Sequence, residues 1–128
     1  MPEYKAPLRD IKFVRDELLG YAEHYEKIGA EDATPDMCDA IIEEGAKFAE
    51  QVLSPLNRSG DQESCQWSEE GVTTPKGFKE AYQQYVEAGW ASLSAEPEMG
   101  GQGLPESLGM VVSEMVGAAN WSWGMYPG

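Results

Sequence analysis

The first apolar pattern in the chain runs over residues 10–29. Its apolar residues recur at alternating steps of three and four, which places them on one face of a helix: Ile11, Val14, Leu18, Tyr21, Tyr25 and Ile28. Charged residues such as Arg15 occupy the opposite face. Asp10 is a candidate N-cap and Gly29 a candidate helix end. The pattern predicts an amphipathic helix over residues 10–29 whose charged side faces solvent.

A second apolar pattern begins at Thr34 and Pro35, a pair typical of a helix N-terminus. Two overlapping stripes follow: Met37, Ile41, Phe48 and Val52, and Cys38, Ile42, Ala49 and Leu53. Together they form a broad apolar face, so we expect this helix to pack on two sides. Gly45 indicates a close helix crossing, because glycine costs about 1 kcal/mol in a helix interior relative to alanine. The residue before a proline avoids the helical conformation, so the helix should end at Ser54, before Pro55.

The connection that follows is long and polar. Residues 55–73 contain glycines, serines and carboxylates, and such a connection is longer than most in compact domains. We expect a loop that Trp67 attaches to the protein surface.

Two further helices complete the pattern. Thr74 and Pro75 repeat the pair seen at the second helix, and the stripe behind them predicts a helix over residues 75–88 that ends at Gly89. A glycine-rich turn then leads into a helix predicted over residues 105–119. No segment alternates apolar and polar residues for long enough to predict a strand. The predicted fold class is therefore all-α, as a helical up-down bundle.

Composition narrows the possible functions. The 128 residues include 23 acidic and 9 basic side chains, for a formal net charge of −14. This charge argues against nucleic-acid binding, which depends on clusters of lysine and arginine. No run of about 18 apolar residues predicts a membrane span, and the N-terminus lacks the apolar core of a secretion signal. Cys38 and Cys65 follow no metal-binding spacing, so we expect free thiols and a cytoplasmic protein.

The residues form no recognisable catalytic set. His24 is the only histidine, and no second histidine or Glu-x-x-His pair accompanies it, so we expect a surface residue. The run from Gly100 to Gly103 lacks the lysine of a phosphate-binding loop and does not follow a strand, so we interpret it as a turn. We predict no catalytic residue, no cofactor-binding residue and no metal ligand in this chain.

The last residues are unusually aromatic. Trp121, Trp123, Met125 and Tyr126 stand within the final eight positions, where natural chains are usually polar. We interpret this end as a cut through a longer protein, with these side chains facing neighbours that the chain lacks.

Three blocks of sequence, in this order, resemble the acyl-CoA dehydrogenase family. Residues 89–114, GWASLSAEPEMGGQGLPESLGMVVSE, are similar to the glycine-rich loop and following helix of its N-terminal helical domain. Residues 48–61, FAEQVLSPLNRSGD, resemble an earlier helix of that domain. Residues 1–10, MPEYKAPLRD, resemble the branch that includes 3-methylmercaptopropionyl-CoA dehydrogenases, which has an extra N-terminal helix. The resemblance divides the chain into an N-terminal extension helix, residues 1–33, and a truncated family helical region, residues 34–128.

The resemblance implies a flavoprotein of fatty acid metabolism. Such an enzyme oxidises acyl-CoA to 2-enoyl-CoA with FAD and passes electrons to an electron-transfer acceptor, and we expect it to be a homo-oligomer. In the family, FAD and the catalytic glutamate belong mostly to later domains, so the 128 residues alone should be inactive and hold no FAD. They would supply scaffold and part of the acyl pocket wall, with five substrate-binding residues: Trp123, Gly124, Met125, Tyr126 and Gly128.

The alternative is a free-standing acidic interaction module. It would bind a partner helix through the broad apolar face of residues 34–54. A reading frame that continues beyond Gly128 into β-rich sequence would favour the enzyme, and a stop codon there would favour the module.

Overall fold

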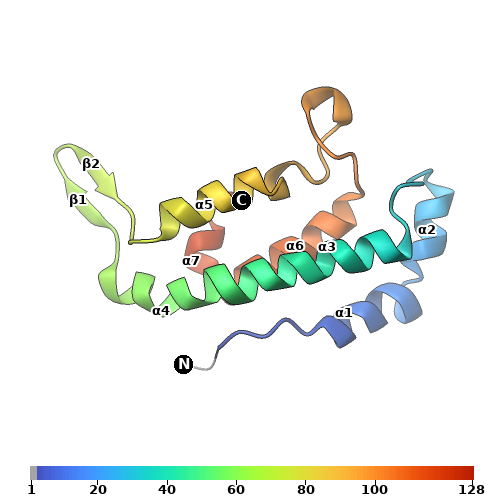
Figure 1. Ribbon diagram of the computed structural model, residues 1–128, viewed down its shortest axis with the longest axis horizontal. Helices are drawn as coiled ribbons and strands as arrows, with labels where there is room; N and C mark the ends of the chain where they lie inside the picture. Colours follow the sequence, from blue (N-terminus) through green and yellow to red (C-terminus); the bar gives the residue numbers. More distant parts are fainter. Residues whose placement is uncertain (1–2) are drawn as a thin grey trace.

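The computed structural model describes residues 3–128, which form an elongated helical bundle (Figure 1). The elements in chain order are α1 (Leu8–Phe13), a π-helical turn η1 (Val14–Leu18), α2 (Tyr21–Lys27), α3 (Pro35–Phe48), a second π-helical turn η2 (Ala49–Leu53), α4 (Ser54–Glu63), β1 (Gln66–Ser68), β2 (Gly71–Thr73), α5 (Phe78–Glu87), two short 3-10 turns (Trp90–Ser92 and Pro97–Met99), α6 (Glu106–Ala119) and α7 (Trp121–Gly124). The chain is mostly helical, which confirms the predicted fold class.

The predicted first helix is broken in two. Gly20 adopts a left-handed conformation with φ of +60°, which ends η1 and turns the chain into α2. The helix begins at Leu8 and has no side-chain cap, so the prediction of Asp10 as N-cap was wrong. The predicted faces hold only in part. Lys12, Glu23, Glu26 and Lys27 are exposed and Tyr25 is buried as expected, but Arg15 is only 4% exposed, whereas Leu18 is 66% exposed. The π-helical turn changes the angle between successive side chains, so a regular α-helical period does not describe this segment.

The second helix begins as predicted and continues further. The Thr34 hydroxyl accepts a hydrogen bond of 3.3 Å from the Met37 amide, which confirms the cap. The helix does not end at Ser54, however, because α3 passes through η2 directly into α4. Pro55 occupies the first turn of α4. The helix continues through this proline because the π-helical turn η2 stands directly before it and replaces the regular α-helical hydrogen-bond pattern there.

A small hairpin follows α4, where we predicted only loop. Strands β1 and β2 pair antiparallel, with Trp67 opposite Val72. Strands of three residues are too short for an alternating pattern to reveal. Trp67 is 78% exposed, so the prediction that it attaches the loop to the surface was wrong.

The last two predicted helices are both present, but each begins later in the chain than predicted. The α5 helix begins at Phe78 behind Gly77, which has φ of +90°, and not at Thr74 and Pro75. Its end at Gly89, with φ of +81°, is as predicted. The α6 helix covers Glu106–Ala119, which confirms the predicted range within one residue.

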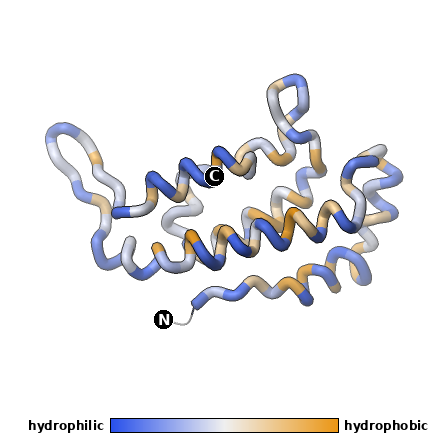
Figure 2. Tube along the Cα trace, in the orientation of Figure 1, coloured by the Kyte–Doolittle hydropathy of each residue, from blue (hydrophilic) through white to orange (hydrophobic). Residues whose placement is uncertain are grey.

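The core lies where α3 and η2 pack against α6, and Figure 2 shows hydrophobic residues recurring along these helices. A Cβ added at Gly45 would lie 3.0 Å from the Met115 Cε atom, which confirms the predicted close crossing of α3 and α6. The broad apolar face of the second helix is largely used inside the molecule. Its buried members are Cys38, Ile42, Ala49 and Leu53, with Ile41, Phe48 and Val52 partly buried against the core. Only Met37 of the two stripes is substantially exposed, at 48%.

The remaining predictions about single residues concern the cysteines and the histidine. Both cysteines are free thiols, Cys38 buried and Cys65 exposed, as expected. His24 lies on the surface, as expected. Within residues 3–128, no helix has the length and apolar character needed to cross a membrane.

Candidate functional site

The five residues predicted to bind substrate all lie in or just after α7. This helix begins at Trp121 because the preceding Asn120 caps it: the Asn120 Oδ1 atom accepts a hydrogen bond of 3.1 Å from the Trp123 amide. The short helix packs against α6 and contacts α4. The segment is therefore built into the bundle, and its side chains divide between inside and outside.

Trp123 belongs to the core. Its side chain is fully buried, and its indole Nε1 donates a hydrogen bond of 3.1 Å to the Phe78 carbonyl oxygen. Its ring makes edge contacts with the rings of Phe48 and Tyr85, at centroid distances of 5.9 and 5.5 Å. The expectation that it faces missing neighbours was wrong, because its neighbours come from α3 and α5 of the same chain.

The other large side chains at this end are on the surface. Trp121, Met125 and Tyr126 are 69%, 65% and 48% exposed. The exposed apolar area at the end of the chain therefore comes from these three residues and not from Trp123.

Three of the predicted residues line one hollow, which we name the α6–α7 hollow. It has a volume of about 400 Å³ and is lined by Tyr85, Ser113, Val116, Gly117, Trp121, Gly124, Met125, Pro127 and Gly128. No charged side chain is among them. Hollows of several hundred Å³ with apolar walls and few polar groups are typical of small-molecule sites. Gly124, Met125 and Gly128 therefore lie together at one hollow whose wall has no charged side chain.

The other two predicted residues line a different hollow, between α5 and α7. The hollow has a volume of about 360 Å³, and Trp123 and Tyr126 line it together with Thr74, Phe78, Lys79 and Tyr82. The Tyr126 ring packs edge-on against Phe78, and its hydroxyl forms a 3.6 Å hydrogen bond with the Cys65 thiol, which raises the pKa of Tyr126. The structure therefore splits the predicted set into two groups on either side of α7.

Sequence reasoning missed the contribution of α6 to the α6–α7 hollow. Ser113 and Gly117 stand one turn apart on this helix, and both line the hollow. The sequence did contain a signal for this. Ser113 and Gly117 are small residues four positions apart, so they lie on the same helix face and leave room beside it for a hollow.

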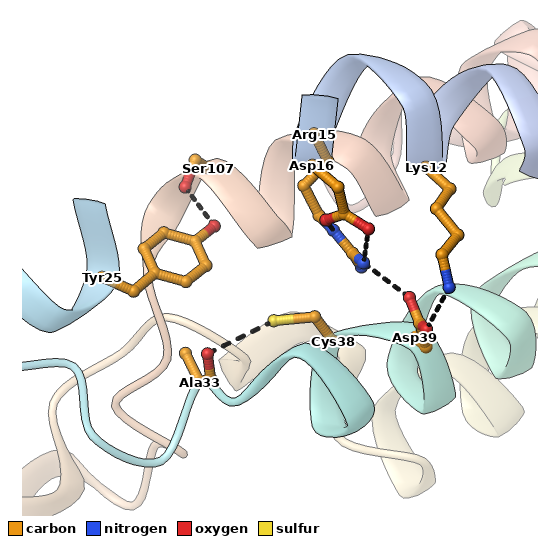
Figure 3. A network of polar contacts seen from close by, with 8 residues as sticks. All are labelled: Lys12, Arg15, Asp16, Tyr25, Ala33, Cys38, Asp39 and Ser107. Atoms are coloured by element: carbon orange, nitrogen blue, oxygen red, sulfur yellow. Dashed lines mark hydrogen bonds and ion pairs between the residues drawn. The ribbon is translucent and has the colours of Figure 1, made fainter. Parts of the chain in front are cut away.

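The strongest polar cluster lies elsewhere, between α1–η1 and α3, and we name it the Arg15 cluster (Figure 3). The buried Arg15 guanidinium donates hydrogen bonds of 2.6 and 2.8 Å to Asp16 and one of 2.6 Å to Asp39. Lys12 donates to the other oxygen of Asp39 at 2.8 Å. The hydrogen bond from Lys12, followed by that from Arg15, lowers the pKa of Asp39. Both carboxylates are occupied by cations, so the cluster holds two elements together and contains no free base.

The nearby Cys38 and Tyr25 are also structural. Burial raises the pKa of the Cys38 thiol, which keeps it protonated and unreactive. The Tyr25 hydroxyl and the Ser107 Oγ atom lie 2.7 Å apart, which joins α2 to α6 (Figure 3). Within the described part of the chain, no three His, Cys, Asp or Glu side chains gather as a metal site would require.

Comparison with known proteins finds similarity to acyl-CoA dehydrogenases, the family that the sequence resembles. No protein-family model matches the chain. The chain is 36% identical over 129 aligned positions, covering 97% of its length, to the 3-methylmercaptopropionyl-CoA dehydrogenase of Ruegeria pomeroyi. It is 25% identical over its whole length to a broad-specificity linear acyl-CoA dehydrogenase of Mycobacterium tuberculosis. It is 31% identical, over 75% of its length, to a butyryl-CoA dehydrogenase of Syntrophomonas wolfei.

These relatives confirm the resemblance to acyl-CoA dehydrogenases and to the 3-methylmercaptopropionyl-CoA branch. The relatives are much longer than the chain, which spans 21%, 21% and 17% of their lengths. Similarity therefore covers nearly all of this chain and about a fifth of each relative.

Proposed function

We propose that this chain, a relative of the acyl-CoA dehydrogenases, is the N-terminal helical region of a FAD-dependent enzyme that oxidises acyl-CoA to 2-enoyl-CoA. Within that enzyme it supplies scaffold and part of the acyl pocket wall. Residues 1–33 form the N-terminal extension and residues 34–128 the family helical region; residues 1 and 2 lie outside the described part. The similarity over 97% of the chain and the helical fold support this proposal.

The α6–α7 hollow is the observation that carries the proposed role. Its wall includes Val116 and Met125 and contains no charged side chain. An acyl chain gains about 0.8 kcal/mol for each methylene that leaves water, so an apolar wall of this kind favours binding of the acyl tail. Gly117 and Gly124, two of the three glycines of this wall, let α6 and α7 approach closely beside the hollow, because neither carries a side chain.

The hollow does not fit FAD. A flavin dinucleotide carries a pyrophosphate, which proteins hold with backbone amides at helix ends or with arginine and lysine. The wall of the α6–α7 hollow has no basic side chain, and the sequence has no lysine or arginine after Lys79. We therefore assign FAD to other parts of the parent enzyme and derive no catalytic step from this chain.

The same proposal covers the partners and the isolated chain. The parent would take acyl-CoA as substrate, pass electrons to an electron-transfer acceptor, work in the cytoplasm and assemble as a homo-oligomer. Residues 1–128 alone should purify without flavin and without dehydrogenase activity. Yellow protein with stoichiometric FAD would contradict this assignment of the cofactor.

The proposal is tested in the full-length parent by substitution at the hollow. Met125→Ala enlarges the space beside the acyl tail, so the ratio of kcat/KM for bulky over short acyl-CoA should rise while flavin content stays constant. Met110→Ala is the matched control, because Met110 is a methionine of α6 that is 66% exposed and does not line the hollow. A change in flavin loading without a change in acyl preference would make Met125 scaffold and remove the pocket assignment.

The interaction-module alternative receives less support. It requires a free apolar face on α3, yet that face is mostly buried against the rest of the chain, with Met37 as its one substantially exposed member among the described residues.

A further inference from the structure

One residue joins the two helices that form the α6–α7 hollow. Asn120 has extended backbone between the end of α6 and the start of α7. Its amide donates to the Val116 carbonyl at 3.0 Å, and its carbonyl accepts from the Gly124 amide at 2.9 Å. The backbone of Asn120 therefore makes both the last hydrogen bond of α6 and the first hydrogen bond of α7.

The Asn120 side chain is almost completely buried, at 1% exposure, and both ends of its amide are engaged. The Oδ1 atom accepts from the Trp123 amide at 3.1 Å and from the Ser122 hydroxyl at 2.9 Å. The Nδ2 atom donates to the Leu53 carbonyl at 3.2 Å, at the end of η2. A buried polar group that loses its hydrogen-bond partner destabilises the fold, so these contacts fix the orientation of α7 relative to both α6 and η2.

The orientation of α7 sets the width of the hollow. A Cβ added at Gly124 would meet the Val116 Cγ1 atom at 3.3 Å, and one added at Gly117 would meet the Trp121 ring at 3.0 Å. The two helices therefore touch through glycines near Asn120, and both glycines also line the hollow. A small tilt of α7 about its first residue moves the wall residues at its far end.

We infer that Asn120 is a positioning residue that determines acyl-chain preference by fixing α7 against α6 and η2. It does not line the hollow itself, so it acts through Gly124 and Met125. This inference rests on the proposed function, because it assigns the α6–α7 hollow to the acyl tail.

The test uses Asn120→Asp in the full-length parent enzyme. The carboxylate keeps the acceptor for the Trp123 amide but places an oxygen against the Leu53 carbonyl, so the link to η2 is lost while the cap remains. We expect the kcat/KM ratio between bulky and short acyl-CoA to change by about threefold or more, mostly through KM, in enzyme that retains its flavin. A merely structural role would lower the yield of flavin-loaded enzyme and leave this ratio unchanged.

Ser122→Ala is the matched control. It removes the hydroxyl that donates to Asn120 Oδ1 and leaves both the cap and the Leu53 link in place, so the ratio should stay at its original value. Asn120→Ser provides a second, uncharged variant, which keeps a short capping oxygen and cannot reach Leu53. If both Asn120 variants fail to give flavin-loaded enzyme, the role is structural and the inference is overturned.

The two proposals fail in different ways. A shifted ratio in Met125→Ala with an unchanged ratio in folded Asn120→Asp and Asn120→Ser overturns the positioning role and leaves the proposed function intact. An unchanged ratio in Met125→Ala and in both Asn120 variants overturns the assignment of the hollow to the acyl tail, and the positioning role with it.

Discussion

The Arg15 guanidinium reaches across from η1 to the Asp39 carboxylate of α3 at 2.6 Å, from a side chain that is only 5% exposed. This ion pair lies between η1 and α3, where the sequence pattern predicted a solvated face. A buried arginine requires an acidic partner, since an isolated buried charge is very unfavourable. Asp39 therefore explains why Arg15 faces inward, and it makes the contact between η1 and α3 dependent on charge.

Loss of this partner should destabilise the fold. Asp39→Asn removes the negative charge from two hydrogen bonds to cations, and such bonds contribute about 1.5–3 kcal/mol each. Because Asp16 still pairs with Arg15 and Asp39 is partly exposed, we expect a loss of about 1–2 kcal/mol in the free energy of unfolding, measured by urea denaturation. The control is Lys47→Ala, which breaks an exposed pair with Glu44 and should cost at most about 0.5 kcal/mol. Equal losses in the two variants would contradict a special role for Asp39.

The same contact should make stability depend on acidity. The pKa of Asp39 is lowered in the folded protein by Lys12 and Arg15. Its stabilising contribution is therefore fully present above the unfolded value, near pH 3.9, and is lost as the pH falls through the lower folded value. Between about pH 6 and pH 3, the free energy of unfolding should fall less in Asp39→Asn than in the unsubstituted protein. Parallel pH profiles would show that Asp39 does not contribute.

The packing of α4 on α5 gives a prediction about glycine. A Cβ at Gly60 would lie 2.7 Å from the Phe78 ring, which is buried and rigid. Alanine normally favours a helix by about 1 kcal/mol over glycine, but overpacking costs about 1–3 kcal/mol. Gly60→Ala should therefore lower the melting temperature. Gly45→Ala is the comparison: its Cβ meets the flexible end of Met115 at 3.0 Å, which can move aside, so this variant should be nearly neutral.

The sequence was sufficient to predict a helix boundary where a single residue determines that boundary. Thr34 and Gly89 act through their own side-chain and backbone chemistry, so the start of α3 and the end of α5 were predictable. Pro55 was misleading, because the π-helical turn before it lets the helix continue. The burial of Arg15 was not predictable from period alone, since it depends on Asp39 from another helix.

The resemblance to acyl-CoA dehydrogenases selected the end of the chain as the candidate site, but the sequence did not show which of its side chains point inward. A helix of four residues is too short for its period to show which side chains point inward. Trp123 points into the core and Met125 out of it, and only the contacts with α3, α5 and α6 distinguish them.

Trp123 and Met125 should therefore respond in opposite ways to substitution in the full-length parent. Trp123→Phe keeps an aromatic ring but removes the indole N–H that donates to the Phe78 carbonyl. An unsatisfied buried carbonyl and a smaller ring should cost about 2–4 kcal/mol, seen as a lower melting temperature. The ratio of kcat/KM between bulky and short acyl-CoA should stay unchanged, because Trp123 does not line the α6–α7 hollow.

Met125→Ala should show the reverse result. Its side chain is 65% exposed, so its removal leaves little empty space in the core and the melting temperature should change only slightly. The acyl preference should move towards bulkier chains, because the substitution widens one wall of the hollow. If Trp123→Phe instead changes acyl preference at constant stability, the acyl tail occupies the hollow between α5 and α7, where Trp123 and Tyr126 lie together. The division of the predicted residues into core and wall would then have to be reversed.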